Sequence, residues 1–277
     1  MSPTGFPSTL LITLFLFGLT LLVVAPGFRR LVHFVSVGYA FAITTMALAT
    51  VILFRQHIGG LALLQNLVLL IWGLRLGIFL LRRENQPSFQ KQASDTDEQY
   101  GSINLPRKFV IWMGVSVLYV CMFLPGLAGA ANPPAGGAIG MTVAQWLGLC
   151  LMVAGLAIES LADWQKSAFK RRYPKEFCTV GLYRWVRCPN YLGEILFWLG
   201  NWAMGLFFYS TLLYWVASLI GLVCIVLIMF GSTRRLESNQ ELRYGELPAY
   251  QNYVRTVPVL FPFVPVFTLK KLRVYLE

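Results

Sequence analysis

Seven long apolar runs, separated by short polar segments, organise the chain. Each run reaches or approaches the ~20 residues that an α-helix needs to cross the hydrocarbon core of a bilayer. The pattern predicts an all-α integral membrane protein with about seven transmembrane helices. The predicted spans are residues 8–25, 34–54, 58–81, 109–131, 139–162, 191–209 and 211–231.

Two parts of this pattern need interpretation. Residues 191–231 hold two apolar runs joined without a clear polar break, so either run is a full span, a half-span or one arm of a bent hairpin. Residues 1–9 contain no Lys or Arg to form the basic start of a secretory signal peptide. We therefore interpret the first apolar run as the first span.

The composition supports the membrane interpretation. Of 277 residues, 57% are hydrophobic and only 13% are charged, whereas a soluble domain carries about 25% charged residues. The five cysteines form no CxxC pair, and three of them lie in apolar runs. This usage favours small buried hydrophobic side chains over a zinc site or a disulfide framework.

The net charge of +11 is concentrated on one side of the predicted spans. The segment after the first span, residues 82–108, residues 163–190 and the tail after residue 231 carry every basic loop residue except Arg55. Because Lys and Arg are retained on the cytoplasmic side, we expect the N-terminus outside and the C-terminus in the cytoplasm. Topology and attraction to anionic lipid alone would explain most of these residues.

Ionisable residues at the ends of predicted spans are the first candidates for function, because such groups are costly inside a bilayer and usually face a cavity or a partner. Glu159 and Asp163 are four residues apart, which places both carboxylates on one helix face. Lys170 and Arg171 follow on the next turns, so the group is either a set of structural ion pairs or a site for a polar ligand. Arg75 lies about two turns from the cytoplasmic end of its span, where snorkelling is the alternative to a functional role.

The stretch "GLYRWVRCPNYLGE", residues 181–194, places polar groups at the start of a predicted span. Pro189 suits the first turn of a helix, and a helix N-terminus offers free N–H groups that favour phosphate. Arg184 and Arg187 stand just before this turn, and Asn190 and Glu194 lie within it and one turn later. Arginine suits phosphate better than lysine does, so the stretch predicts an anion site at the membrane surface.

The common soluble cofactor motifs are missing. The sequence has no GxGxxG after a strand and no GxxxxGK[ST], so any nucleotide is bound without a Rossmann turn or P-loop. Nucleic acid is an improbable partner, because the basic face belongs to loops beside a membrane. In the tail, "RRLESNQELRYGELPAYQNYVR" predicts a short amphipathic helix and a turn that lie against the membrane face.

Four stretches resemble the steroid 5α-reductase family and its bacterial relatives. "GLYRWVRCPNYLGE" closely resembles the C-terminal signature of that family, and "ESLADWQKSAFK" resembles the segment before it. "RYGELPAYQNYVRTVPVLFPF" resembles the closing segment, and "WGLRLGIFLLRR" is similar to the arginine motif of the third span. Together they cover roughly residues 70–265 in the family's order.

The resemblance implies an NADPH-dependent oxidoreductase that reduces a carbon–carbon double bond conjugated to a ketone, typically in a 3-oxo-Δ4 steroid. Hydride would go to the β-carbon and a proton to the α-carbon. It also implies one membrane domain over residues 1–277, with residues 1–108 shaping the substrate pocket and residues 109–277 forming most of the cofactor site. A bacterial inner membrane, a cytoplasmic cofactor site and no obligate protein partner complete the expectation.

The resemblance also implies roles for individual residues. Trp72 and Arg75 match positions at the substrate pocket. The family positions that contact or support the cofactor match Arg83, Glu159, Asp163, Lys170, Asn190, Tyr191, Glu194, Tyr244 and Arg255. Four further basic residues of the same face complete our predicted cofactor site, namely Arg171, Arg184, Arg187 and Arg235. No metal ligand is predicted.

Two departures from the family matter. Cys188 stands where many relatives have His, which we expect to alter packing rather than activity. Animal members polarise the substrate ketone with a Glu and Tyr pair, but the first four predicted spans contain no acidic residue, and Trp72 stands at the Tyr position. Tyr39 is our candidate for the hydroxyl donor.

Three other functions remain open at this stage. Membrane methyltransferases of the isoprenylcysteine type, which use S-adenosylmethionine, share a similar "RxPxYxGE"-like stretch. A reductase of sterol ring double bonds is a nearer alternative in the same chemical class. A non-catalytic membrane scaffold or small transporter would have no use for Asn190 and Glu194.

Overall fold

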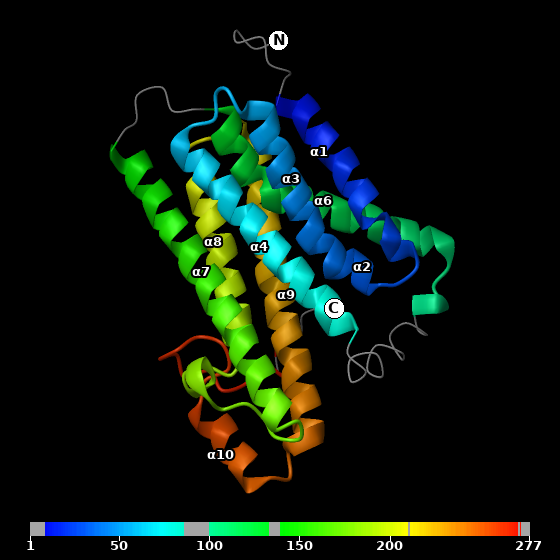
Figure 1. The fold of residues 1–277 in the computed structure, drawn as a ribbon, viewed down its shortest axis with the longest axis vertical. Coiled ribbons are helices and arrows are strands. Elements are labelled where there is room, and N and C mark those ends of the chain that lie inside the picture. Colours follow the sequence, from blue (N-terminus) through cyan, green and yellow to red (C-terminus); the bar gives the residue numbers. More distant parts are fainter. Residues whose placement is uncertain (1–8, 86–99, 133–138, 210, 271, 273–277) are drawn as a thin grey trace. The chain divides into compact units, whose positions relative to one another are not determined.

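The computed structural model describes residues 9–85, 100–132, 139–209, 211–270 and 272, and every regular element in these ranges is a helix. Residue 8 of the first predicted span and most of the loop 82–108 lie outside them. Figure 1 shows the order of the helices along the chain. The helices are α1 (Thr9–Val24), η1 (Ala25–Phe28), α2 (Val32–Val35), α3 (Val37–Phe54), α4 (Gly60–Glu84), α6 (Leu105–Ala131), α7 (Ile139–Arg172), η2 (Gly181–Arg184), α8 (Pro189–Gly205), α9 (Leu212–Tyr244) and α10 (Pro248–Thr256).

Six helical segments within the described ranges are long and apolar enough to cross a membrane. They are Thr9–Phe28, His33–Phe54, Gly60–Glu84, Leu105–Ala131, Thr142–Arg172 and Leu212–Tyr244. The predicted span 191–209 corresponds to α8, which has 17 residues and falls short of the ~20 that a full crossing needs. The all-α class of the sequence prediction is confirmed for the described residues, and six of their helices suit a membrane by length and composition.

Two helices run past the ends that hydropathy predicts. α7 continues from the predicted end at residue 162 to Arg172, and α9 continues from residue 231 to Tyr244. The added segments contain no Gly or Pro and many good helix formers. Each helix stops where a breaker follows, at Pro174 and at Gly245.

The chain forms two compact units, of which the first comprises residues 1–146 and 202–221. Within it, α1, α3, α4 and α6 lie side by side (Figure 1). A buried amide links two of these helices, because Asn66 Nδ2 donates to the carbonyl oxygens of Ala62 (2.9 Å) on its own helix and of Gly126 (3.1 Å) on α6. Hydrogen bonds of this kind join helices where lipid supplies no hydrophobic driving force.

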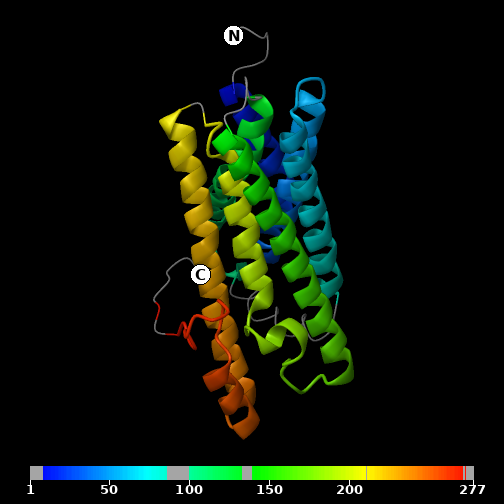
Figure 2. The same ribbon diagram turned by 90° about the vertical axis from the view of Figure 1, so that its left-hand side faces the viewer.

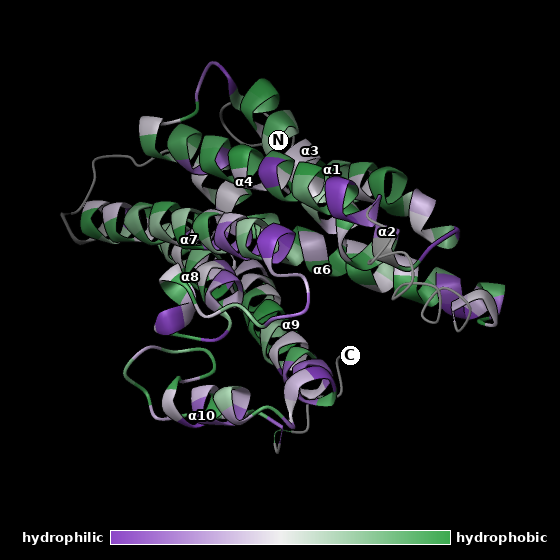
Figure 3. Ribbon diagram, turned by 60° about the horizontal axis from the view of Figure 1, so that its bottom comes forward, coloured by the Kyte–Doolittle hydropathy of each residue, from purple (hydrophilic) through white to green (hydrophobic). Residues whose placement is uncertain are grey.

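The second unit comprises residues 147–201 and 222–277 and is built on the crossing of α7 and α8. A Cβ atom on Gly193 would lie 2.7 Å from the Glu159 nitrogen and 2.7 Å from the Gly155 oxygen. Only glycine permits this backbone approach, as is usual at close helix crossings in membranes. In Figure 3 the bodies of the helices are hydrophobic, while hydrophilic residues gather at the ends of α7 and α9 and in α10.

Candidate functional site

The two predicted carboxylates of α7 are buried within the second unit. Glu159 is 3% exposed and Asp163 is 8% exposed. The crossing at Gly193 brings the first turns of α8 against the Glu159 backbone. The structure thus brings Glu159 together with the segment that contains Glu194, which is itself buried.

The loop between α7 and α8 folds back on α7. Gly181 adopts a φ of 61°, a conformation that favours glycine, and the next N–H, of Leu182, donates to Gln165 Oε1 at 2.9 Å. This turn buries Tyr183, whose hydroxyl donates to the Ala162 oxygen at 3.4 Å. The loop is therefore a fixed part of the unit and not a free linker.

Tyr183 lies close enough to Asp163 for the carboxylate charge to affect the ionisation of its hydroxyl. Burial raises the pKa of Tyr183, and the Asp163 carboxylate raises that pKa further. Tyr183 consequently stays protonated at neutral pH beside a predicted cofactor residue. We did not select this tyrosine from the sequence, because we assigned the function of this stretch to the neighbouring arginines and Asn190.

Lys170 and Tyr244, predicted as separate cofactor contacts, touch each other. Lys170 Nζ lies 2.8 Å from the Tyr244 hydroxyl and also donates to the carbonyl oxygens of Pro174 (3.3 Å) and Glu176. These bonds join the end of α7, the following loop and the end of α9. Lys170 and Tyr244 thus hold three segments together, although the resemblance gave each residue its own contact with the cofactor.

Arg187 does not join Arg184 at the predicted anion site on the surface. Its guanidinium is buried, and Nη2 lies 2.8 Å from Glu237 Oε1 and 2.5 Å from the Phe267 oxygen. Glu237 Oε2 in turn accepts from the N–H of Leu269 at 2.8 Å. Glu237 belongs to the part of α9 that the predicted end at residue 231 leaves out, so the sequence pattern offered no partner for Arg187.

The remaining predicted residues of this unit lie nearer the surface. Asn190 and Tyr191 are half-buried in the first turn of α8. Four basic side chains are exposed, namely Arg171, Arg184, Arg235 and Arg255. The second unit therefore combines inner carboxylates with outer cations, a set that suits a ligand with hydroxyl and phosphate groups.

Cys188 is a buried thiol immediately before α8. Its backbone N–H donates to the Val259 oxygen at 3.0 Å, and its side chain is hydrogen-bonded with Thr233. Burial raises its pKa to about 12. A neutral thiol thus stands at the position of the signature stretch where the resemblance leads us to expect a histidine.

The first unit contains the predicted substrate-side residues, and it also contains Arg83, which we predicted as a cofactor contact. Tyr39 and Trp72 are buried in contact, with ring centroids 5.1 Å apart, and the ring of Tyr119 lies 5.2 Å from that of Tyr39. The guanidinium groups of Arg75 and Arg83 lie 5.6 and 5.9 Å from the centre of one ring, that of Phe79. The structure brings Tyr39 and Trp72 together, and it places both arginines beside a shared aromatic ring.

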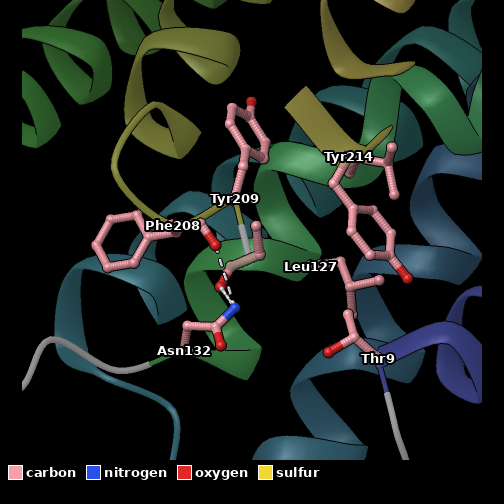
Figure 4. A pocket seen from close by; sticks show the side chains of 8 residues that line it. Thr9, Leu127, Asn132, Phe208, Tyr209 and Tyr214 are labelled. Carbon is pink, nitrogen blue, oxygen red and sulfur yellow. Dashed lines mark hydrogen bonds between the residues drawn. The ribbon is translucent and has the colours of Figure 1, made fainter. Parts of the chain in front are cut away.

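A small pocket lies elsewhere in the first unit (Figure 4). Its volume of about 10 Å³ is at the lower limit of the space that can hold one water molecule. The residues around it are Thr9, Leu124, Leu127, Ala128, Asn132, Phe208, Tyr209 and Tyr214. None of them belongs to the predicted site, so this pocket is not a candidate for substrate or cofactor.

Comparisons with known proteins give a family without an assigned activity. A family described as "Protein of unknown function (DUF1295)" matches residues 27–257. An uncharacterized protein of Schizosaccharomyces pombe is 30% identical over 138 residues, which are 42% of this chain and 38% of that protein. The chain thus matches well under half the length of this curated relative. No solved structure matches.

Proposed function

The chain belongs to the DUF1295 family, and from that premise we propose that it is an NADPH-dependent reductase of a lipophilic enone. The most suitable substrate class is the 3-oxo-Δ4 steroids, which the four sequence stretches of the steroid 5α-reductase family indicate. The family description itself assigns no activity, so the proposal depends on the residues.

One observation carries the proposal. The stretches that resemble the reductase signature in separate parts of the sequence join in a single compact unit. The Lys170–Tyr244 contact of 2.8 Å links the first stretch to the last, and the Gly193 crossing links the first to the middle one. A fourth stretch, with Trp72 and Arg75, belongs to the other unit.

The donor set of the second unit fits the chemistry of a dinucleotide. Exposed arginines such as Arg171 and Arg235 suit phosphate, and the buried carboxylates of Glu159 and Asp163 can accept hydrogen bonds from ribose hydroxyl or amide groups. The geometry also limits the prediction. Arg187 is already bound to Glu237, so we assign it to holding the fold around the site and not to the phosphates.

NADPH would supply the hydride, and the residues of this chain would orient it and exclude water. Asn190 and Tyr191, half-buried at the start of α8, are suited to orient the nicotinamide. In the substrate unit, the hydroxyl of Tyr39 beside Trp72 is our candidate to stabilise the developing enolate oxygen. A flat apolar enone would enter from the lipid between helices.

We also propose the location of the reaction. The basic segments predict a cytoplasmic cofactor side, with the N-terminus outside. The resemblance to the bacterial relatives of the reductase family leads us to propose a bacterial inner membrane. A soluble, anionic cofactor would then arrive from the cytoplasm while the substrate arrives through the bilayer.

The test measures cofactor binding and enone reduction on the same preparation. NADPH fluorescence is titrated against detergent-purified protein, with S-adenosylmethionine in parallel, and reduction of a 3-oxo-Δ4 steroid is followed by product analysis. We expect NADPH binding, and a loss of turnover of about 100-fold or more in Asn190→Ala and in Glu194→Gln. Gln251→Ala, on the exposed face of α10, is the control and should keep full activity.

The melting temperature of each variant in detergent separates a lost site from a lost fold. Normal turnover by both site variants would contradict the site assignment. Binding of S-adenosylmethionine alone would favour the methyltransferase, and binding of neither cofactor would favour a scaffold or transporter.

A further inference from the structure

An uncharged apolar segment follows α10. Residues 257–267, "VPVLFPFVPVF", contain no charged or hydrogen-bonding side chain, and we refer to them as the apolar strap. The strap is not helical, and several of its side chains face outward: Phe263 is 87% exposed and Val264 is 44% exposed. Exposed apolar surface is unfavourable in water, so an exposed apolar segment of this kind indicates a covering partner.

Backbone hydrogen bonds hold the strap at the beginning of α8. The N–H groups of Arg187 and Cys188, just before that helix, donate to the oxygens of Pro258 and Val259, each at 3.0 Å. Within the same unit, the ring of Phe261 lies 6.3 Å from that of Phe230, which belongs to the apolar part of α9. The first basic residue of α9, Arg234, comes one turn later. The strap therefore lies beside the start of α8 and beside the end of the apolar part of α9. In Figure 2 it turns back along α9 in red.

The buried ion pair described above clamps the far end of the strap. Arg187 donates to the oxygen of Phe267, the last strap residue, and Glu237 accepts from the N–H of Leu269 just beyond it. The strap is thus fixed at both ends, so the exposure of its middle is a property of the fold.

The backbone of the strap is adapted to a medium that contains little water. Three of its eleven residues are prolines without an N–H, and the N–H groups of Val257 and Val259 donate to the oxygens of Tyr253 and Val266, each at 2.9 Å. Backbone groups left without partners are costly in lipid. Fewer free donors therefore lower the cost of contact with a bilayer.

Phe263 points away from the unit together with a second exposed aromatic residue. Its φ of 65° is uncommon for a residue with a Cβ atom. Its ring lies 6.1 Å from that of Trp185, which is 61% exposed and follows the exposed Arg184. Aromatic rings beside a basic residue are typical of a protein surface at the lipid headgroups.

We propose that the apolar strap and Trp185 insert into the headgroup and acyl boundary of the leaflet in which α8 begins. The occupant of this surface is the bilayer itself. Phe263 and Trp185 enter the interface, and Arg184 faces anionic headgroups. The proposal concerns the contact of the protein with lipid and does not depend on the reaction or the cofactor.

Spin-label accessibility tests the proposal. Each of the five native cysteines is changed to alanine, and one label is attached to Phe263→Cys or, as the matched control, to Gln251→Cys on α10. The full chain is reconstituted in nanodiscs of phosphatidylcholine and phosphatidylglycerol. We expect the ratio of collisions with oxygen, which dissolves in lipid, to collisions with a water-soluble nickel chelate to be severalfold higher at position 263 than at position 251.

Two results would overturn the proposal: equal ratios at the two positions, or protection of position 263 from both reagents, which would indicate a protein cover. If the cysteine-free chain does not fold, photoreactive benzoylphenylalanine at position 263 in the native chain replaces the label. Crosslinks to phospholipid would support the insertion. Crosslinks to polypeptide alone, or none to lipid, would reject it.

Discussion

Arg187 illustrates how a single basic residue changes its meaning between sequence and structure. In the sequence it precedes a helix start and suggests a phosphate ligand. In the structure it is 3% exposed and bound to Glu237, 50 residues later in the chain. A buried charge without a partner is costly. Removal of either residue of a buried ion pair therefore destabilises the folded protein.

This pair predicts a specific pattern of stability. Arg187→Met and Glu237→Leu should each destabilise the protein by about 3–5 kcal/mol, because each leaves the other charge buried without its partner. The double variant should lose less than the sum of the two, since it leaves no unpaired charge. Melting temperatures or denaturation in a fixed detergent would measure all three variants.

Arg184→Met, at the exposed neighbour, is the control and should change stability by less than about 0.5 kcal/mol. Strict additivity of the two single changes would contradict a coupled ion pair.

At the residue scale, sequence reasoning located polar residues but not their partners. The pattern indicated Glu159, Asp163, Lys170 and Tyr244, and these lie in one compact unit. It did not show that Lys170 contacts Tyr244, because 74 residues separate them in the sequence. Tyr183 was missed, because neither its burial nor its proximity to Asp163 is visible in the sequence.

At the scale of elements, the crossing of α7 and α8 depends on the absence of side chains. Gly155 and Gly193 face each other, and a Cβ atom on Gly155 would lie 2.5 Å from the Gly193 oxygen. The approach sets the position of Glu159 relative to the first turns of α8. The geometry of the candidate site therefore rests on two glycines as much as on its charged residues.

We expect Gly193→Ala to destabilise the protein by about 3 kcal/mol, the upper end of the range for overpacking, because its methyl group would meet backbone atoms that cannot move aside. Gly114→Ala on α6 is the matched control, since its added methyl group would meet no atom within 4 Å beyond its chain neighbours and the backbone of its own helix. The control should leave the melting temperature unchanged or slightly raised. An equal loss in both variants would contradict the importance of the crossing.

The sequence predicted the helices better than their ends. Apolar runs located each long helix, because burial in lipid requires a continuous hydrophobic stretch. Hydropathy could not locate the ends of α7 and α9, since both helices continue as polar segments after the apolar run finishes. Helix propensity and the breakers Pro174 and Gly245 set those ends instead.

At the scale of the whole molecule, the number of crossings decides whether the two termini lie on the same side of the membrane or on opposite sides. Six helical segments among the described residues meet the length and composition for a span. α8, with 17 residues, is about one turn shorter than the ~20 residues that a full crossing needs. The distribution of basic residues predicts that α8 also crosses, as part of seven spans, with the N-terminus outside and the C-terminus in the cytoplasm.

Reporter fusions would measure this topology directly. A phosphatase that is active only outside the cytoplasm should work when fused to the N-terminus, and a fluorescent protein that folds in the cytoplasm should work at the C-terminus. Activity of one reporter type at both ends would indicate an even number of crossings and would contradict seven spans.

The length of α7 has a consequence for the membrane that suits this protein. At 1.5 Å per residue, its 34 residues extend for ~51 Å, well beyond the ~30 Å hydrocarbon thickness. The turns that carry Asp163 and Lys170 are a rigid continuation of the buried helix, so their height above the lipid follows from tilt and bilayer thickness. Longer acyl chains would draw these polar turns toward the headgroups. The fatty-acid composition of the host membrane would therefore change the distance of the site from the lipid surface.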